Sequence, residues 1–299
     1  HLATARLFII DDYYFPVYVI KPRKRTEIIQ LWHAAGAFKK FGFSTLGYKD
    51  GPSDKYLDEI KIHSNYSKVY VSSANVIPIY AEAFNMDPTK IIPLGVPRTD
   101  YFFELDSHEK LKKTFYYKYP MLLKRKLILY APTFRGKSHD QNSIHVSLDI
   151  KLLKDILGEG YALLTHFHPY TQKDVCIDYL NDFVFPMNGK FSIEELMVIS
   201  DVLVTDYSSI VFDFSLLAKP IAFFADDLKS YQEDRGFYFD YMDFIPGPFF
   251  CETSELAAWI KEGCFDQKKV LDFQACFFDE INGNATKRIV NNILENILD

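Results

Sequence analysis

The chain has 299 residues, 48% of them hydrophobic and 25% charged, which is the composition of a globular protein with room for two domains. Its formal net charge is −6, and a net acidic chain is a poor candidate for sequence-independent nucleic-acid binding, which needs a broad basic surface. The acidic excess lies in residues 200–299, with 18 acidic and 8 basic residues, so the net positive front part could still meet an anionic lipid or a polyanionic acceptor.

Short apolar runs alternate with helix-like segments, which predicts a parallel α/β architecture. The last four runs are almost continuously apolar, as expected of strands in a sheet that is covered on both faces. The expected strands are Arg6–Ile10, Glu27–Trp32, Lys68–Ser72, Lys126–Ala131, Tyr161–Thr165, Asp201–Thr205 and Pro220–Ala225.

Helices are expected in most of the gaps between these strands. One of them has a capping box at its start, in which Ser192 and Glu195 can satisfy each other's backbone N–H groups. The expected helices are Ala74–Phe84, Ser147–Leu157, Ser192–Ser200, Ser208–Leu217, Glu255–Glu262 and Ala285–Leu298.

A change of composition predicts the domain boundary. Residues 110–126 hold seven Lys and Arg residues, no acidic residue and several interleaved aromatic residues. We therefore expect two Rossmann-like domains, 1–109 and 110–283, with a cleft between them where α/β proteins usually bind ligands. The C-terminal helix, 284–299, is expected to pack back on the first domain. Because the chain opens without Met, directly before a strand, the front of the first domain is expected to be missing.

The four cysteines are widely spaced and form no C-x-x-C pair, so a disulfide framework is not indicated and a reducing cytoplasm is expected. No apolar stretch approaches the roughly 18 residues of a membrane-spanning helix, and no signal peptide is visible.

A candidate phosphate site follows the strand that ends at Thr205. The segment Thr205-Asp206-Tyr207-Ser208-Ser209 lies between a buried strand and a helix, which places hydroxyls and backbone N–H groups at a helix N-terminus. The alternative is an ordinary serine N-cap.

Two further polar turns also follow predicted strands. In Ala131-Pro132-Thr133-Phe134-Arg135-Gly136, the planar guanidinium of Arg135 suits phosphate oxygens, although it could equally belong to a surface turn. The second turn is His166-Phe167-His168-Pro169. All three turns lie at carboxyl ends of strands in one predicted domain, where open α/β sheets bind ligands.

His33 is a candidate general base in the first domain. It lies in Gln30-Leu31-Trp32-His33-Ala34-Ala35-Gly36, where a strand breaks at a turn of small residues. A histidine there can accept a proton near neutral pH, although a lone histidine is more often structural.

The eight histidines form no metal-binding signature, so no tightly bound zinc is expected. The chain has no G-x-x-x-x-G-K-[ST], G-x-G-x-x-G or G-x-S-x-G motif, which argues against P-loop kinases, NAD enzymes and α/β-hydrolases.

Seven segments in order resemble the catalytic region of the CDP-glycerol and CDP-ribitol glycerophosphotransferases of teichoic-acid and capsule synthesis. The resemblance covers nearly the whole chain, although the family's common W-H-G-T is here Trp32-His33-Ala34-Ala35-Gly36. The segments are LWHAAGAFKKFG, IIPLGVPRTDYF, ILYAPTFRG, HFHPY, SDVLVTDYSSIVFDFSLLAKPIAFF, YQEDRGFYFDY and NGNATKRI.

The resemblance implies a GT-B fold, with the acceptor side in domain 1–109 and the CDP-alditol donor in domain 110–283. It implies that an acceptor hydroxyl attacks the β-phosphorus of the donor and that CMP leaves. It also implies that His33 is the base and that His168 steadies the phosphates. The residues expected at the donor and its phosphates are Trp32, Gly36, Arg98, Thr133, Arg135, Pro169, Thr205, Asp206, Tyr207, Ser208, Ser209 and Arg235.

The implied partners are CDP-glycerol or CDP-ribitol and a lipid-linked polymer acceptor, with no nucleic acid and no tightly bound cofactor; a divalent ion is possible but not indicated. The basic and aromatic segment 110–126 is expected to meet the inner face of a bacterial membrane. Two other interpretations stay open: a nucleotide-sugar glycosyltransferase of the same fold, and a non-catalytic nucleotide-binding or scaffolding domain of a larger synthase.

Overall fold

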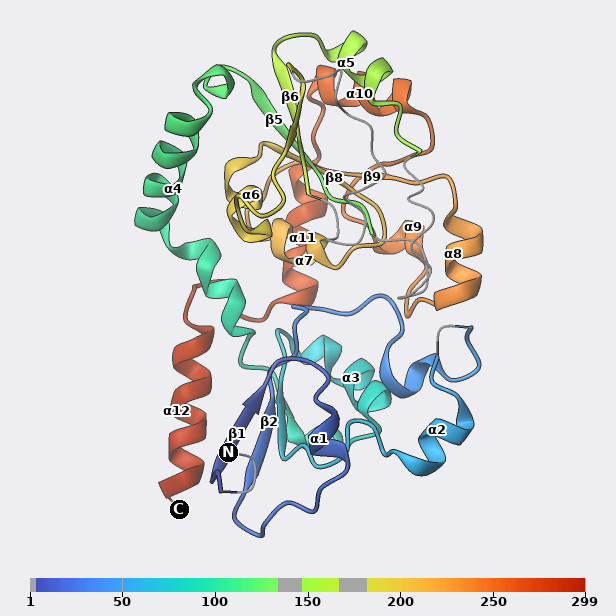
Figure 1. Ribbon diagram of the computed structural model, residues 1–299, viewed down its shortest axis with the longest axis vertical. Coiled ribbons are helices and arrows are strands. Elements are labelled where there is room, and N and C mark those ends of the chain that lie inside the picture. Colours follow the sequence, from blue (N-terminus) through green and yellow to red (C-terminus); the bar gives the residue numbers. More distant parts are fainter. Residues whose placement is uncertain (1–3, 50, 134–146, 167–181, 299) are drawn as a thin grey trace. The chain divides into compact units, whose positions relative to one another are not determined.

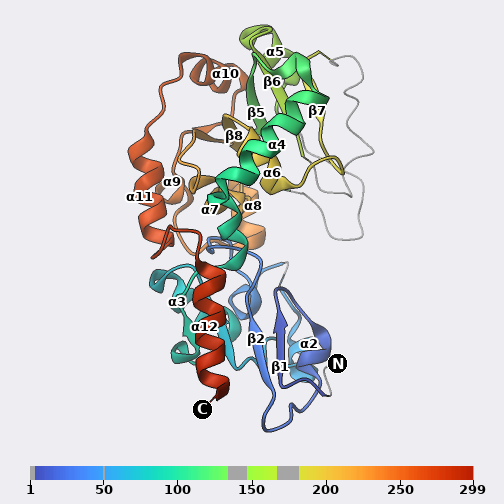
Figure 2. The same cartoon turned by 90° about the vertical axis from the view of Figure 1, so that its left-hand side faces the viewer.

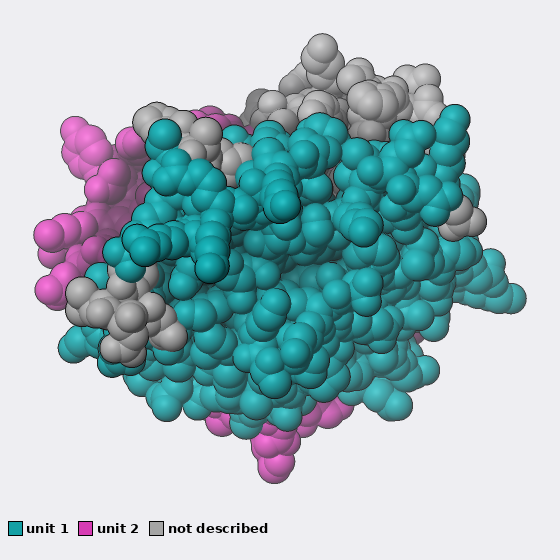
Figure 3. Space-filling view, turned by 90° about the horizontal axis from the view of Figure 1, so that it is seen from below, with its two compact units in different colours: residues 1–103, 227–244, 274–299 teal, residues 104–226, 245–273 magenta. Residues whose placement is uncertain are grey.

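The computed structural model describes residues 4–49, 51–133, 147–166 and 182–298 (Figure 1). The chain folds into two compact units, which Figure 3 distinguishes by colour. The first unit consists of residues 1–103, 227–244 and 274–299, and the second of residues 104–226 and 245–273.

The first unit is built on a four-stranded parallel sheet in the order β1-β2-β3-β4. The strands are β1 (Leu7–Ile10), β2 (Glu27–Gln30), β3 (Lys68–Tyr70) and β4 (Ile91–Ile92). The helices of this unit are α1 (Phe15–Tyr18), α2 (Asp54–Glu59), α3 (Ile77–Phe84), α8 (Leu228–Arg235), α9 (Tyr241–Phe244) and α12 (Ala285–Leu298).

The C-terminal helix α12 lies against this sheet (Figures 1 and 2). Its buried Ile289 and Ile293 share a core cluster with Ile29 of β2 and Tyr70 of β3. The Tyr70 hydroxyl donates a hydrogen bond of 2.8 Å to Asn292 on the same helix. A helix from the end of the chain therefore completes the core of the unit that contains its beginning.

The second unit is built on a six-stranded parallel sheet in the order β10-β9-β8-β5-β6-β7. The chain passes from β5 through β6 to β7 and then returns to the other side of β5, so the strand order reverses between β5 and β8. The strands are β5 (Lys126–Tyr130), β6 (Tyr161–Thr165), β7 (Val184–Pro186), β8 (Val202–Thr205), β9 (Ile221–Phe224) and β10 (Phe249–Phe250).

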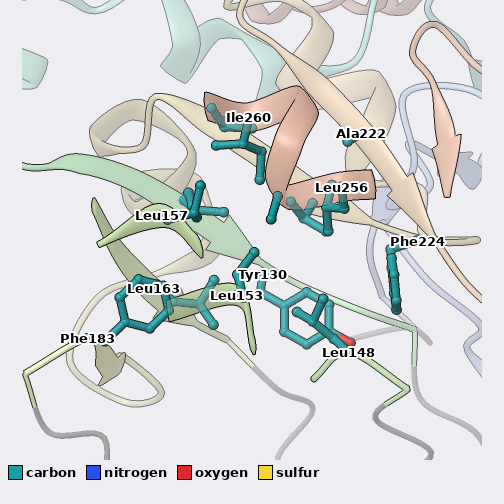
Figure 4. Close-up of a cluster of buried hydrophobic side chains, with 14 of the residues drawn as sticks. Tyr130, Leu148, Leu153, Leu157, Leu163, Phe183, Ala222, Phe224, Leu256 and Ile260 are labelled. Atoms are coloured by element: carbon teal, nitrogen blue, oxygen red, sulfur yellow. The ribbon is translucent and has the colours of Figure 1, made fainter. Parts of the chain in front are cut away.

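Helices cover both faces of this second sheet. On one face, alternate strand residues such as Ile128 and Tyr130 pack with Leu153 and Leu157 of α5 and with Leu256 of α10 (Figure 4). The intervening residues Leu127 and Leu129 are also fully buried, which explains the continuous apolar sequence of the strand. The helices with residues in this unit are α4 (Leu105–Lys118), α5 (Ile150–Leu157), α6 (Ile193–Ile199), α7 (Ile210–Ser215), α10 (Thr253–Glu262) and α11 (Gln267–Phe277).

All seven predicted strands are present, and each end lies within two residues of its expected position. The capping box is also confirmed, because Ser192 Oγ accepts a hydrogen bond from the backbone N–H of Glu195 and Glu195 accepts one from that of Ser192. The strands β4, β7 and β10 were not expected. They have two or three residues each, too few for a recognisable pattern.

The two units divide the chain differently from the expected domains. The division falls between Phe103 and Glu104, because residues 105–118 form α4 of the second unit. Residues 227–244, expected in the second domain, belong to the first unit, where the backbone N–H of Tyr238 donates to the carbonyl of Phe38 at 2.7 Å. This pairing joins positions 200 residues apart, so composition along the chain does not reveal it.

None of the helices in the described part of the chain has the length and apolar character needed to cross a membrane.

Candidate functional site

In the first unit, polar side chains gather where β1 and β2 end. These strands are parallel neighbours, with Ile10 opposite Gln30, so the residues that follow them emerge at the same edge of the sheet. Asp12 follows β1 and His33 follows β2. The expected position of His33, at a strand-end turn, is confirmed by the structure, and its side chain is 51% exposed.

Several residues hold His33 in place. Its ring stacks on that of Trp32, with the centroids 4.5 Å apart and an interplanar angle of 27°. Its backbone carbonyl accepts a hydrogen bond from Nη1 of Arg98. On the other side, Oδ1 of Asp12 lies 3.4 Å from Nδ1 of His33. This arrangement leaves the other ring nitrogen, Nε2, away from the carboxylate that Nδ1 faces.

Trp32 supports the ring of His33. It has a φ of 57°, which is unusual for a bulky residue, and it is 6% exposed. Its ring contacts those of Phe41, His63 and Phe84. The aromatic contacts hold the tryptophan in this conformation, and the sharp turn it makes brings His33 to the surface.

Arg98 and Gly36 occupy positions that differ in accessibility. Arg98 is half-buried and donates to the His33 carbonyl, so part of its hydrogen-bonding capacity holds the histidine loop. Gly36 is buried, and the neighbouring carbonyl of Ala35 accepts a hydrogen bond from the hydroxyl of Ser72. The small-residue turn is therefore packed against the end of β3.

In the second unit, the ends of β5 and β8 meet at the point where the strand order reverses. In open α/β sheets such a reversal opens a crevice beside the carboxyl ends of the strands, where ligands bind. Thr133 follows β5 and the TDYSS segment follows β8. The structure thus brings these two predicted turns together.

Three residues of the TDYSS segment have buried side chains or structural hydrogen bonds. Thr205 and Tyr207 are fully buried, and the Thr205 hydroxyl donates to the carbonyl of Ala131 at 2.8 Å. Asp206 is 2% exposed, and its Oδ1 accepts hydrogen bonds from the backbone N–H groups of Thr133 at 2.7 Å and of Tyr207 at 2.6 Å. The carboxylate of Asp206 therefore joins the two strand ends.

Ser208 and Ser209 are the more accessible members of the segment. Both are half-buried and directly precede α7. Oγ of Ser208 accepts a hydrogen bond of 3.4 Å from the backbone N–H of Ile210. Ser209, the N-cap residue of α7, makes no side-chain cap hydrogen bond, so both hydroxyls lie beside the first N–H groups of the helix.

The third predicted turn is described only as far as His166. This side chain follows β6, and its partial burial lowers its pKa, an effect that the carboxylate of Glu194 opposes. Arg135, His168 and Pro169 lie outside the described residues.

Arg235 is the last residue of α8, in the first unit. It is exposed, and its neighbour Asp234 pairs with Lys49 at 3.1 Å. The structure therefore places Arg235 in the same unit as His33 and Arg98, and not in the unit that contains Thr133 and the TDYSS segment.

Sequence reasoning missed two residues of the first site. Gln30 is fully buried and donates to the backbone carbonyl of Asp12 at 3.0 Å, while its Oε1 accepts from the backbone N–H of Trp32 at 2.8 Å. The signal for Asp12 was its position two residues after a predicted strand. The signal for Gln30 was an amide in an otherwise apolar run.

Within the described residues, no group of three or more His, Cys, Asp or Glu side chains is arranged to hold a metal ion.

Comparison with known proteins places this chain among phosphotransferases. The family model for CDP-glycerol:poly(glycerophosphate) glycerophosphotransferase matches residues 1–295. A teichoic acid ribitol-phosphate primase of Bacillus spizizenii is 41% identical over 97% of this chain and 75% of its own length. A teichoic acid poly(ribitol-phosphate) polymerase of the same organism is 42% identical over 98% of this chain.

The fold has a solved counterpart. A structure of the wall teichoic acid polymerase TagF, an H444N variant soaked with CDPG, superimposes with a TM-score of 0.83 at 26% identity, over 98% of this chain and 73% of that one. The α/β architecture with two parallel sheets is therefore the GT-B-like fold that the sequence predicts. The chain spans about half the length of the matched polymerase, 47%, so that relative contains further sequence.

Proposed function

Because the chain belongs to the CDP-glycerol:poly(glycerophosphate) glycerophosphotransferase family, we propose that it transfers an alditol-phosphate group from a CDP-alditol to an acceptor hydroxyl and releases CMP. One observation carries the proposal beyond family membership. An exposed histidine ring is fixed at the carboxyl edge of a parallel sheet by a stacked tryptophan, an arginine on its carbonyl and a carboxylate near its Nδ1. This is the geometry that a general base requires.

In the proposed reaction, Nε2 of His33 accepts the proton of the acceptor hydroxyl. The hydroxyl oxygen forms a bond to the β-phosphorus of the donor, the bond from that phosphorus to the bridging oxygen breaks, and CMP leaves with the electron pair. Such a transfer depends on positioning and charge stabilisation more than on covalent catalysis. In this reaction Arg98 would hold the loop that carries His33.

The donor phosphates are proposed to bind in the second unit, at the reversal between β5 and β8. The support comes from Ser208 and Ser209, whose hydroxyls lie beside the first N–H groups of α7. This turn would be held in position by the three buried residues that precede the serines, Thr205, Asp206 and Tyr207. Arg135, His168 and Pro169 are proposed to complete the site on the strength of the sequence motifs alone. This assignment makes the unit that contains His33 the acceptor side, while Arg235 stays a proposed donor contact on the strength of its sequence motif alone.

The donor is proposed to be CDP-ribitol in preference to CDP-glycerol. Both of the relatives compared above, at 41% and 42% identity, are named for ribitol phosphate. No tightly bound cofactor is proposed for this chemistry, and a divalent ion would supply charge stabilisation to the donor phosphates.

The acceptor is proposed to be a lipid-linked cell-wall or capsule polymer, which the protein would meet at the inner face of a bacterial membrane. Support for this location comes from residues 110–126, in α4 and the turn after it. Tyr117, Met121 and Leu123 are 88%, 55% and 61% exposed among the lysines of this segment. Phe115, which the sequence suggested as a lipid contact, is fully buried and packs on Phe191, so it cannot serve.

A donor panel tests the proposed function. CMP release is measured with CDP-ribitol, CDP-glycerol and a UDP-sugar, for the wild type and for His33→Ala. We expect CMP from a CDP-alditol only, and a loss of roughly 10²- to 10⁴-fold in the variant, the usual contribution of a general base. Turnover of the UDP-sugar alone would indicate a glycosyltransferase. Absence of any nucleotide binding would indicate a scaffolding domain, and normal turnover by folded His33→Ala would exclude His33 as the base.

A further inference from the structure

We infer that Asp12 is a positioning residue that sets the tautomer and orientation of the His33 imidazole. The inference rests on the proposed role of His33 as base. Its starting point is a distance: Oδ1 of Asp12 lies 3.4 Å from Nδ1 of His33. This is an ion-pair distance, longer than the roughly 2.7–3.2 Å of an N–H···O hydrogen bond, and catalytic hydrogen bonds often tighten only when substrate is bound.

The pairing of β1 with β2 brings Asp12 and His33 together. Because β1 and β2 are parallel neighbours, and the backbone N–H of Leu31 donates to the carbonyl of Ile10 at 2.8 Å, the two strands end side by side. Asp12 and His33 follow these ends by two and three residues, so they meet above the same edge. Twenty residues separate the two in sequence, and only the strand pairing brings them together.

A buried amide connects the two loops. Gln30 donates through Nε2 to the carbonyl of Asp12 at 3.0 Å and accepts through Oε1 from the backbone N–H of Trp32 at 2.8 Å. The same Nε2 lies 3.1 Å from the hydroxyl of Tyr66. Since Gln30 is fully buried, these bonds are shielded from water and fix the backbone on both sides of the pair.

The side chain of Asp12 is also held by a hydrogen bond within its own turn. Its Oδ1 accepts a hydrogen bond of 2.7 Å from the backbone N–H of Tyr13. This bond sets the direction of the carboxylate, and it also provides a competing explanation, in which Asp12 only stabilises its own turn. The experiment must separate these two roles.

The chemistry favours positioning. A neutral imidazole carries its proton on one nitrogen and a lone pair on the other, and the partner of one nitrogen decides which. A carboxylate facing Nδ1 accepts the proton there, so the lone pair is on Nε2, where it can take the proton of a hydroxyl. The same carboxylate would stabilise the imidazolium that forms in the transfer.

Asp12→Asn is the decisive variant. Its side-chain oxygen can still accept from the backbone N–H of Tyr13, so the turn is preserved. That oxygen takes the place of Oδ1, which in the aspartate also faces Nδ1 of His33, so the variant keeps an acceptor there but removes the negative charge that favours the proton on Nδ1 and stabilises the imidazolium. Asp11→Asn is the matched control, because it removes the same charge from the adjacent exposed residue, which has no described contact with His33.

We expect kcat for CMP release from the CDP-alditol to fall roughly 10- to 100-fold in Asp12→Asn, with KM for the donor unchanged and Asp11→Asn at the wild-type rate. The loss should be smaller than in His33→Ala, because this exposed carboxylate orients the base and does not itself accept the proton. Asp12→Glu, which keeps the carboxylate, should recover part of the rate.

A second readout does not depend on turnover. In ¹⁵N-histidine-labelled protein, the His33 ring signals, identified by their absence in His33→Ala, should report the proton on Nδ1 in the wild type and a shift toward Nε2 in Asp12→Asn. If His33→Ala abolishes activity while Asp12→Asn keeps both the wild-type kcat and the wild-type tautomer, Asp12 only stabilises its turn. The inference about Asp12 is then wrong, and the proposed role of His33 stands. If folded His33→Ala is fully active, the proposed base fails, and the inference fails with it.

Discussion

Oδ1 of Asp100 accepts a hydrogen bond of 2.8 Å from the backbone N–H of Ala285, across 185 residues of sequence. Oδ2 of the same carboxylate accepts from the backbone N–H of Thr286, and the guanidinium of Arg288 donates through Nε to the carbonyl of Leu94. Two sequence motifs, GVPRTD and NGNATKRI, are thereby joined at the start of α12. Asp100 and Arg288, one from each motif, thus hold the start of this helix in place.

Removal of this cap should loosen the C-terminal helix. We expect Asp100→Ala to lower the free energy of unfolding by about 1–2 kcal/mol, the upper range for loss of a helix N-cap, because two N–H groups of α12 lose their acceptor. The change is measured by urea unfolding, followed by both fluorescence and circular dichroism, whose transitions should coincide. Asp100→Asn, which keeps one oxygen acceptor, should lose less, and an unchanged midpoint in Asp100→Ala would show that α12 is held by its apolar face alone.

The buried His63 should make the stability of the first unit depend on pH. Burial lowers the pKa of His63 to about 3, well below its unfolded value of 6.5. The folded state thus holds the ring neutral while the unfolded chain binds a proton, so stability is fully present above pH 6.5. It should fall by up to about 1.4 kcal/mol per pH unit as the pH drops from 6.5 toward 3.

His63→Asn tests this dependence, because asparagine tolerates the left-handed conformation that His63 adopts, with a φ of 58°. The variant should be less stable at neutral pH, since His63 packs on Phe84 with the ring centroids 4.4 Å apart. Its free energy of unfolding should nevertheless decline less steeply between pH 6 and 4. Identical slopes for the two proteins would show that other groups cause the acid sensitivity.

The serine turn of the second unit should recognise phosphate. We expect the double variant Ser208→Ala and Ser209→Ala to bind a CDP-alditol at least roughly tenfold more weakly, since each lost hydrogen bond to a charged group costs about 1.5–3 kcal/mol net. Binding of free cytidine should be almost unchanged. Isothermal titration calorimetry with both ligands measures the difference, with Ser107→Ala as a control at an exposed serine of the same unit. Equal losses for donor and nucleoside would remove the turn from phosphate binding.

Membrane association should depend on residues 110–126. We expect the protein to sediment with anionic vesicles at low salt and to be released as salt is raised, because basic residues near such a surface contribute about 1 kcal/mol each. Reversal of Lys112, Lys113, Lys124 and Arg125 to Glu should abolish binding. Removal of exposed apolar side chains, by Tyr117→Ser and Leu123→Ser, should weaken it at every salt concentration.

A charge-matched control is available for this experiment. Reversal of four exposed lysines elsewhere, Lys151, Lys229, Lys269 and Lys287, changes the net charge by the same amount and should leave binding nearly intact. If both sets of reversals abolish sedimentation equally, the attraction is a property of net charge and not of α4. If the wild type stays in the supernatant, this part of the chain does not target a membrane by itself.

The parts of this protein whose physical cause is local could be predicted from its amino-acid sequence. Apolar runs such as Tyr161–Thr165 identified the strands, because a strand buried on both faces must be apolar throughout. Ser192 and Glu195 identified a helix start, because a capping box is closed within four residues. The turns that follow strands, including the one with His33, followed from the breaks in those runs.

The three-dimensional fold was needed to see which turns share a site and what each polar residue does in it. Asp206, which the sequence predicts at the donor phosphates, also joins two strand ends, because the partners of its carboxylate include Thr133, 73 residues away. Asp12 had no visible role until the pairing of β1 with β2 brought it to His33. Hydrogen-bond partners and strand neighbours are set by distance in space, and a single sequence records only distance along the chain.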